Sequence, residues 1–124
     1  MFRTRKEENR ARAELGRAAE TAVAERLIRE GYTIVARNLR VGRAEIDLVA
    51  KRGRLVAFVE VRARRTPGFG SPLETIDDAK IARIRAAAAR YLHASRYRAC
   101  AVRFDAVAVT FEPELEIDYL ANAF

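Results

Sequence analysis

The stretch of residues 45–62, EIDLVAKRGRLVAFVEVR, constrains the fold of this chain more than any other part of the sequence. Two runs rich in apolar and β-branched residues flank residues 51–54, where Gly53 supplies the freedom that a tight turn requires, so we predict a β-hairpin. Strand alternation places successive residues on opposite faces. In the first strand, one face carries Glu45, Asp47 and Val49, and the other carries Ile46, Leu48 and Ala50. In the second strand, one face carries Phe58, Glu60 and Arg62, and the other carries Ala57, Val59 and Val61. The strands otherwise look buried, and a buried carboxylate is costly unless a metal or a cation pairs with it.

The charge of the chain is large and unevenly distributed. The formal net charge is +7 and the isoelectric point is about 10.3. All 24 Lys and Arg lie in residues 1–103, whereas residues 104–124 hold five acids and no base. So basic a chain favours a polyanionic partner, and nucleic acid is the first candidate. The alternative is the ordinary solvated surface of an arginine-rich protein, and charge alone leaves both readings open.

Length and composition predict one domain spanning residues 1–124, because the chain is short and half of its residues are apolar. Cys100 is a single cysteine, which excludes an internal disulfide and fits a reducing compartment. The N-terminal segment has no apolar signal-peptide core, and no apolar run approaches the ~20 residues needed to span a bilayer. We therefore expect a soluble, cytoplasmic protein without membrane association.

Hydrophobic periodicity predicts the element order α-β-β-β-α-β-β. Residues 1–8 are expected to be flexible, and a helix is expected from an Asn9 cap to residue 30. A strand over residues 32–37, a connection over 38–43, the hairpin and a loop with two prolines follow. A second helix capped by Thr75, a strand over 99–111 and a short strand over 115–119 complete the chain. These elements predict an α/β (α+β) domain in which helices flank a mixed sheet.

The spacing of Asp47, Glu60 and Arg62 is the pattern that points to chemistry. In a hairpin the two carboxylates can converge, and with the carbonyl of Val61 they would offer oxygen ligands that suit Mg²⁺ or Mn²⁺. A bound metal polarises a phosphoryl oxygen and activates water, and Arg62 would orient that water or offset charge. Glu20, at the edge of the first helix, is a further ligand or supporting group. The spacing equally allows a cross-strand network in which Arg62 neutralises the acids.

Several basic residues lie close to this pattern in the sequence. Arg64 and Arg65 precede the proline- and glycine-containing loop, Lys80 lies at the start of the second helix, and Arg43 precedes the hairpin. We interpret these four as nucleic-acid-binding residues that neutralise phosphates and position a backbone. A solvated basic loop is the alternative.

The sequence resembles the YraN-like family of small bacterial proteins along nearly its whole length. The matching positions include Gly16, Glu20, Ala24, Gly31, Tyr32, Arg37, Asn38, Glu45, Ile46, Asp47, Leu48, Phe58, Val59, Glu60, Val61, Phe69, Gly70, Pro72, Lys80, Arg103, Phe104, Asp105, Asn122, Ala123 and Phe124. The resemblance implies a restriction-endonuclease-like fold with a PD-(D/E)xK site, as in the Holliday-junction resolvases. It also implies that Asp47 and Glu60 are metal ligands and that Glu20 is the helix glutamate.

Arg62 departs from that resemblance, because the motif has a lysine at this position. Arginine stays protonated and cannot act as a base, although it can still orient a phosphate. Three hypotheses therefore remain open. The protein is a metal-dependent nuclease acting on DNA, a non-catalytic nucleic-acid-binding protein of the same fold, or a structural domain that forms a homodimer through its acidic C-terminal segment.

Overall fold

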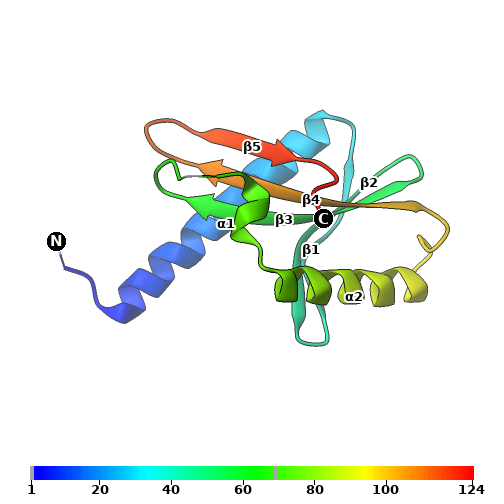
Figure 1. Cartoon of the computed structure of the whole chain (residues 1–124). Helices are drawn as coiled ribbons and strands as arrows, with labels where there is room; N and C mark the ends of the chain where they lie inside the picture. Colours follow the sequence, from blue (N-terminus) through cyan, green and yellow to red (C-terminus); the bar gives the residue numbers. More distant parts are fainter. Residues whose placement is uncertain (1, 69) are drawn as a thin grey trace.

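The computed structural model describes residues 2–68 and 70–124 and confirms the predicted element order (Figure 1). The elements are α1 (Arg5–Arg29), β1 (Thr33–Val41), β2 (Ala44–Arg52), β3 (Leu55–Arg64), the 3₁₀ turn η1 (Pro72–Thr75), α2 (Asp78–Ala94), β4 (Ala101–Thr110) and β5 (Glu116–Leu120). The five strands form one mixed sheet in the spatial order β1-β2-β3-β4-β5. Neighbouring strands are antiparallel except for β3 and β4, which are parallel and are connected through η1 and α2.

Two apolar clusters, one on each side of the sheet, bury the helices. The α1 cluster contains Val23 and Leu27 from the helix packed on Leu48, Val59 and Val109 of the sheet. The α2 cluster packs the apolar side of α2 against the opposite side of the strands, with members that include Ile46, Val49, Phe58, Ile84 and Ala88. The molecule is therefore a three-layer α/β/α arrangement, with α1 and α2 on opposite faces (Figure 1).

Helix α1 begins earlier than the sequence predicts. Thr4, not Asn9, is the cap, and its side chain accepts a hydrogen bond from the Glu7 N–H at 3.1 Å. Residues 5–8, expected to be flexible, are therefore helical, while Met1 and Phe69 lie outside the described residues. The buried positions of α1 start at Ala19, so its N-terminal half extends past the sheet (Figure 1).

The β1–β2 ribbon is longer than predicted, because the expected connection over residues 38–43 is strand as far as Val41. Asn38 adopts φ +49°, and the cross-strand register omits Asn38 and Asp47. The side chains of β2 change faces across this irregularity. Ile46 packs on the α2 side of the sheet, whereas Leu48 and Ala50 pack on the α1 side. The prediction that Ile46 shares a face with Leu48 and Ala50 is therefore wrong, because simple alternation is interrupted at Asp47.

The predicted hairpin of β2 and β3 is confirmed, with Gly53 at φ +59° in its two-residue turn. Its paired register runs from Arg52 and Leu55 to Leu48 and Val59. Beyond this point the two strands continue, but β2 remains paired with β1 and β3 remains paired with β4. The sheet thus has a seam between β2 and β3, and Asp47 and Glu60 lie at the seam.

Helix α2 begins at Asp78, and Asp77 is its cap rather than the predicted Thr75. The Asp77 side chain accepts a hydrogen bond from the backbone N–H of Lys80 at 2.7 Å. The bond fixes the first turn of α2, where Lys80 lies. Since β3 and β4 are parallel, the connecting α2 must run back along the sheet, which brings its start beside the C-terminal half of β3.

Candidate metal and nucleic-acid site

The backbone of Val61 and the side chain of Asp47 join β3 to β2 where strand pairing has ended. The Val61 N–H donates to Asp47 Oδ2 at 2.8 Å, so a carboxylate replaces the carbonyl that a continued ladder would provide. The N–H and C=O of one strand residue point toward the same neighbouring strand. The carbonyl of Val61 therefore faces the same side as Asp47.

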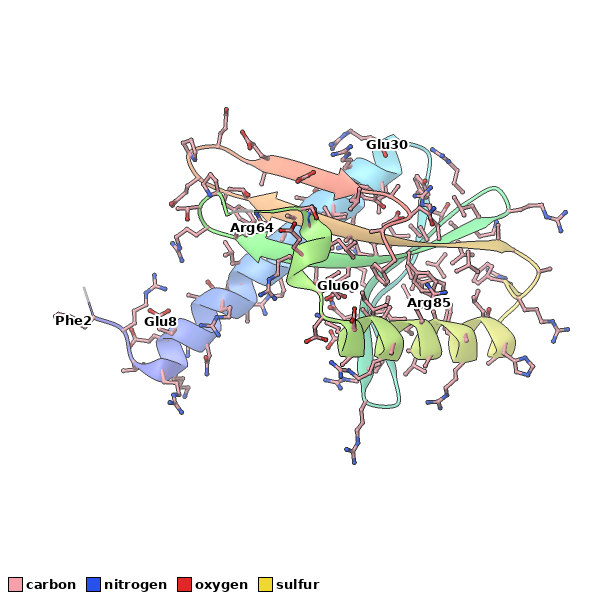
Figure 2. The ribbon with its side chains drawn as sticks, viewed as in Figure 1. Phe2, Glu8, Glu30, Glu60, Arg64 and Arg85 are labelled. Carbon is pink, nitrogen blue, oxygen red and sulfur yellow. The ribbon has the colours of Figure 1, made fainter. Side chains whose placement is uncertain are left out.

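Glu60 is buried, with 8% of its surface exposed, and its carboxylate contacts the ammonium of Lys80. Glu60 comes from the α2 face of β3, and Figure 2 shows it beside the start of α2. A buried carboxylate without a partner is strongly destabilising, so Lys80 provides the counter-charge for this position. The alternative prediction was a network in which Arg62 neutralises the acids. Among the described residues, the ion pair with Glu60 comes from Lys80 instead.

Opposing effects act on the pKa of Asp47. Burial, followed by the nearby charge of Glu60, raises its pKa to about 8, although the hydrogen bond from Val61 favours the charged form. Glu20 also contributes to this repulsion, which places the helix glutamate within electrostatic reach of both acids. Two acids that repel each other in a buried seam would be relieved by a cation.

Asn38 connects the helix glutamate to the start of β2. With its amide nitrogen turned toward the two carboxylates, Asn38 donates to Glu20 Oε1 at 3.1 Å and to Glu45 Oε1 at 3.0 Å. Burial nevertheless raises the pKa of Glu20, and the charges of Glu45 and Glu60 act in the same direction. The seam therefore gathers acids from α1, β2 and β3.

A hollow of about 280 Å³ opens over the seam between the tip of the β1–β2 ribbon and the start of α2. Asp47 and Glu60 lie in its wall, and Arg43, Lys80 and Arg83 provide cations on its rim. A buried and a half-buried carboxylate beneath a cationic rim are suited to a metal ion and a phosphate group together.

The donor set fits a hard divalent cation. Asp47, Glu60 and the carbonyl of Val61 provide oxygen atoms only, and the repulsion at Asp47 favours a cation between the two acids. Within the described residues, no three His, Cys, Asp or Glu side chains are grouped closely enough to hold an ion by themselves. Mg²⁺ usually keeps several waters and binds proteins through one or two carboxylates, so two carboxylates and a carbonyl are sufficient.

The predicted basic residues lie in three different places. Arg43 and Lys80 line the hollow, whereas Arg65 lies in a separate groove beside α1, together with Arg62. Arg64 borders a cavity between the loop after β3 and the strands β4 and β5, away from the hollow. One buried guanidinium nitrogen of Arg64 has no hydrogen-bond partner among the described residues. Arg64 is thus the predicted contact that the fold separates from the acids.

Sequence reasoning missed Asn38 and Arg83 and underrated the ion pair of Lys80 with Glu60. Asn38 carried a signal, because asparagine is one of the few residues that tolerate a positive φ. Arg83 lies one helical turn after Lys80, a spacing that places both on one side of α2. The pairing of Lys80 with Glu60 depends on how α2 packs on the sheet, and no local pattern encodes that packing.

Comparisons with known proteins identify relatives of this chain. The model of the uncharacterised protein family UPF0102 matches residues 19–109. The UPF0102 protein sce2912 of Sorangium cellulosum is 44% identical over 119 residues, covering 92% of this chain and 83% of the relative. A UPF0102 protein of Ectopseudomonas mendocina is 40% identical over 112 residues, covering 90% and 94%. The matched region contains the seam, the hollow and the start of α2.

Among solved structures, the chain is similar to Pyrococcus furiosus SfsA in complex with Ca²⁺. The TM-score is 0.38 at 16% sequence identity, and the match covers 83% of this chain and 62% of the SfsA chain. Neither of the described helices combines the length and the apolar character needed to cross a membrane.

Proposed function

This chain belongs to the uncharacterised protein family UPF0102, the YraN-like family that its sequence resembles, and we propose that it is a metal-dependent nuclease acting on DNA. One observation carries the proposal: Asp47 and Glu60 converge in a buried seam beneath a cationic rim. That combination is what phosphodiester hydrolysis requires, because the reaction needs an activated water and stabilisation of added negative charge.

Asp47, Glu60 and the carbonyl of Val61 would hold Mg²⁺ or Mn²⁺. The ion would supply Lewis-acid polarisation of a phosphoryl oxygen and a more acidic water. In the hydrolysis, the water oxygen would form a bond to phosphorus and release a proton to solvent, and the bond from phosphorus to the leaving oxygen would break as that oxygen takes up a proton from solvent. The chain's own contribution is to hold the carboxylates in position, which the Val61 N–H does for Asp47, and the ion would favour the ionised form of that carboxyl.

Lys80 would take the part that the motif gives to the lysine at position 62. Its ammonium already contacts Glu60, and its flexible stem allows it to reach a phosphate or a water bound in the hollow. Arg62 would contact the substrate rather than the carboxylates, because it lines the neighbouring groove. In this arrangement the site has a lysine beside its carboxylates even though position 62 is an arginine.

Glu20 would act on the site from the α1 side. Asn38 holds it together with Glu45, and Arg43, Lys80 and Arg83 are positioned to contact phosphates at the rim. DNA is the proposed substrate, because its phosphates would neutralise the cations that line the hollow.

A cleavage assay on linear, circular and branched DNA with Mg²⁺ or Mn²⁺ tests the proposal. Asp47→Asn and Glu60→Gln should each lower the rate by 100-fold or more, on the order expected for losing a group that acts in the transition state. Asp118→Asn is the matched control, because Asp118 is an exposed acid on β5. Cleavage that persists in both site variants would contradict the proposal.

The non-catalytic alternative is favoured by one observation, the ion pair of Lys80 with Glu60. In that reading the ammonium is the permanent counter-charge and the site binds DNA without an ion. Salt-dependent DNA binding in EDTA, with no cleavage by the wild type or by Arg62→Lys, would support it. Calorimetric titration with Mn²⁺ separates the two functions, because the alternative predicts no binding that depends on Asp47.

A further inference from the structure

A second depression lies on the α1 side of the sheet, beside the acids but separate from the hollow. This groove, of about 550 Å³, runs between the N-terminal half of α1 and the C-terminal half of β3. Leu15 and Val61 contribute to its apolar floor, and Arg12, Arg62 and Arg65 line it against a single acid, Glu8. Figure 2 shows Glu8 on the part of α1 that extends beyond the sheet.

The three arginines of the groove are available to a ligand. In the described part of the chain, no hydrogen bond, ion pair or ring contact engages the guanidinium groups of Arg12, Arg62 or Arg65, and all three residues are exposed.

A cavity at the opposite end of the sheet is also lined by cations, but it differs from the groove in how they are bonded. Its cations are already used within the fold: Lys51 bonds to the Gly53 carbonyl, Arg52 to the Glu30 carbonyl and Arg96 to the Tyr97 hydroxyl. The groove beside α1 therefore differs in holding cations that the fold itself does not employ.

In the part of the chain that the structure describes, the N-terminal half of α1 has no buried residue. The buried positions of the helix begin at Ala19, so residues 5–18, nearly four turns at ~3.6 residues per turn, precede the part of the helix that joins the core. Gly16 also lines the groove and has open space where a Cβ would lie. A helix in water gains most of its stability from packing, so this extension is expected to have a partner.

The groove is continuous with the acids through β3. Arg62 lines both the groove and a small cavity that contains Glu60 and Lys80, and Val61 links Asp47 to the groove floor. From this continuity we propose that the groove binds the sugar–phosphate backbone of the DNA strand whose reacting phosphate lies at Asp47 and Glu60. The inference rests on the proposed function and names the part of the substrate that the groove holds.

The two sets of cations would contact the strand on either side of the reacting phosphate. Arg43 and Arg83 lie on the α2 side of the seam, while Arg12 and Arg65 lie on the α1 side. A strand that crosses the seam is thus held both before and after the reacting bond. The substrate is therefore an internal phosphodiester of a continuous strand, and a free strand end is not required.

Equilibrium binding in EDTA tests the groove without any requirement for cleavage. The double variant Arg12→Ala/Arg65→Ala should bind a fluorescent DNA single strand on the order of tenfold more weakly at low salt, and the slope of log K against log[salt] should fall by about 1.4. The double variant Arg29→Ala/Arg54→Ala is the matched control, because it also removes one helical and one loop arginine, both exposed and outside the groove. Equal affinity of the two double variants would overturn the proposal.

A covalently closed single-stranded DNA circle tests the consequence for the substrate. The wild type should convert the circle to a linear strand, and Arg12→Ala/Arg65→Ala should do so more slowly than the control. If no variant cleaves but the groove variant still binds more weakly, the groove stands and the nuclease function falls. If cleavage occurs and only DNA with free ends is cut, the nuclease function stands and the groove assignment is wrong.

Discussion

Asp47 combines a structural and a chemical role in one side chain. One oxygen accepts the Val61 N–H and so continues the connection between β2 and β3, while the carboxyl also lies in the field of Glu60. Hydrogen bonding favours the ionised form, and burial and like charge favour the neutral form. The second pair of effects dominates, so Asp47 binds its proton more tightly in the folded protein than in the unfolded chain.

This imbalance predicts how the stability of the metal-free protein depends on pH. The pKa of Asp47 rises from 3.8 to about 8 on folding, so its protonation stabilises the fold at low pH, and this stabilisation is lost as the pH rises toward 8. The free energy of unfolding, measured with urea in EDTA, should fall over that range by an amount on the order of a few kcal/mol. Asp47→Asn should flatten the profile, and a profile parallel to that of the wild type would contradict the prediction.

Lys80 supports a second prediction at the residue scale. Lys80→Met leaves the buried Glu60 without its partner, which should destabilise the metal-free protein by about 1–3 kcal/mol, less than for a fully buried pair because Lys80 is partly exposed. The same change should strengthen Mn²⁺ binding, since an ammonium no longer competes for the carboxylate.

Arg83→Met is the control for Lys80, because it removes a cation from the same rim without contacting Glu60. Thermal denaturation with and without Mn²⁺ measures both effects. A Lys80→Met protein that Mn²⁺ stabilises no more than the wild type would show that the ammonium and the metal do not share the site.

At the scale of elements, the β2–β3 hairpin was predictable because its information is local. The alternation, the β-branched runs and Gly53 lie within one short stretch. The extent of β1 and the face of Ile46 were not predictable in this way. In sequence, Asn38 and its neighbours Arg37 and Arg40 are typical of a loop. Pairing with β2 nevertheless places this segment in a strand.

Two glycines with open space around them should respond to alanine with opposite signs. Gly53 has φ +59°, so Gly53→Ala should destabilise the protein by about 1–2 kcal/mol through the backbone alone. Gly16 lies within α1, so Gly16→Ala should stabilise the protein by roughly 0.5–1 kcal/mol. Urea titration of both variants measures the difference, and shifts of equal sign would show that contacts rather than φ control one of the sites.

At the scale of the whole molecule, the acidic C-terminal segment is part of the sheet. Asp105 is fully buried and accepts hydrogen bonds from Arg103, from the Tyr119 hydroxyl at 2.5 Å and from the Asn122 N–H at 2.9 Å. Phe124 packs on Phe104 with ring centroids 5.4 Å apart. Removing this segment to test for a homodimer would therefore remove a strand and expose a buried carboxylate.

Tyr119 tests how strongly this network holds the chain together. Tyr119→Phe removes one hydrogen bond from a buried carboxylate and should lower the free energy of unfolding by about 1.5–3 kcal/mol. Tyr97→Phe is the matched control, because the hydrogen bond that the Tyr97 hydroxyl accepts from Arg96 is exposed. This control should lower the free energy of unfolding by only about 0.5 kcal/mol. Equal effects of the two substitutions on the urea midpoint would contradict a central role for Asp105.

Only the part of the candidate site that lies within one hairpin could be predicted from the sequence. Asp47 and Glu60 belong to one hairpin, and their convergence follows from strand pairing. Glu20, Asn38 and Lys80 come from three other elements, and what they contact depends on how α1, β1 and α2 pack on the sheet. Long-range packing of this kind leaves little trace in sequence periodicity.

The seam between β2 and β3 also has a mechanical consequence. Beyond Leu48 and Val59, the tip of the β1–β2 ribbon is joined to β3 through the Asp47 side chain, while its own pairing continues to Val41 and Ala44. A small rotation of the tip can change the spacing of the two carboxylates without breaking a ladder hydrogen bond. The strand pairing therefore constrains the two acids less than it constrains the paired residues. In the proposed metal site, ions of different radius would be accommodated by bending of the ribbon rather than by loss of strand pairing.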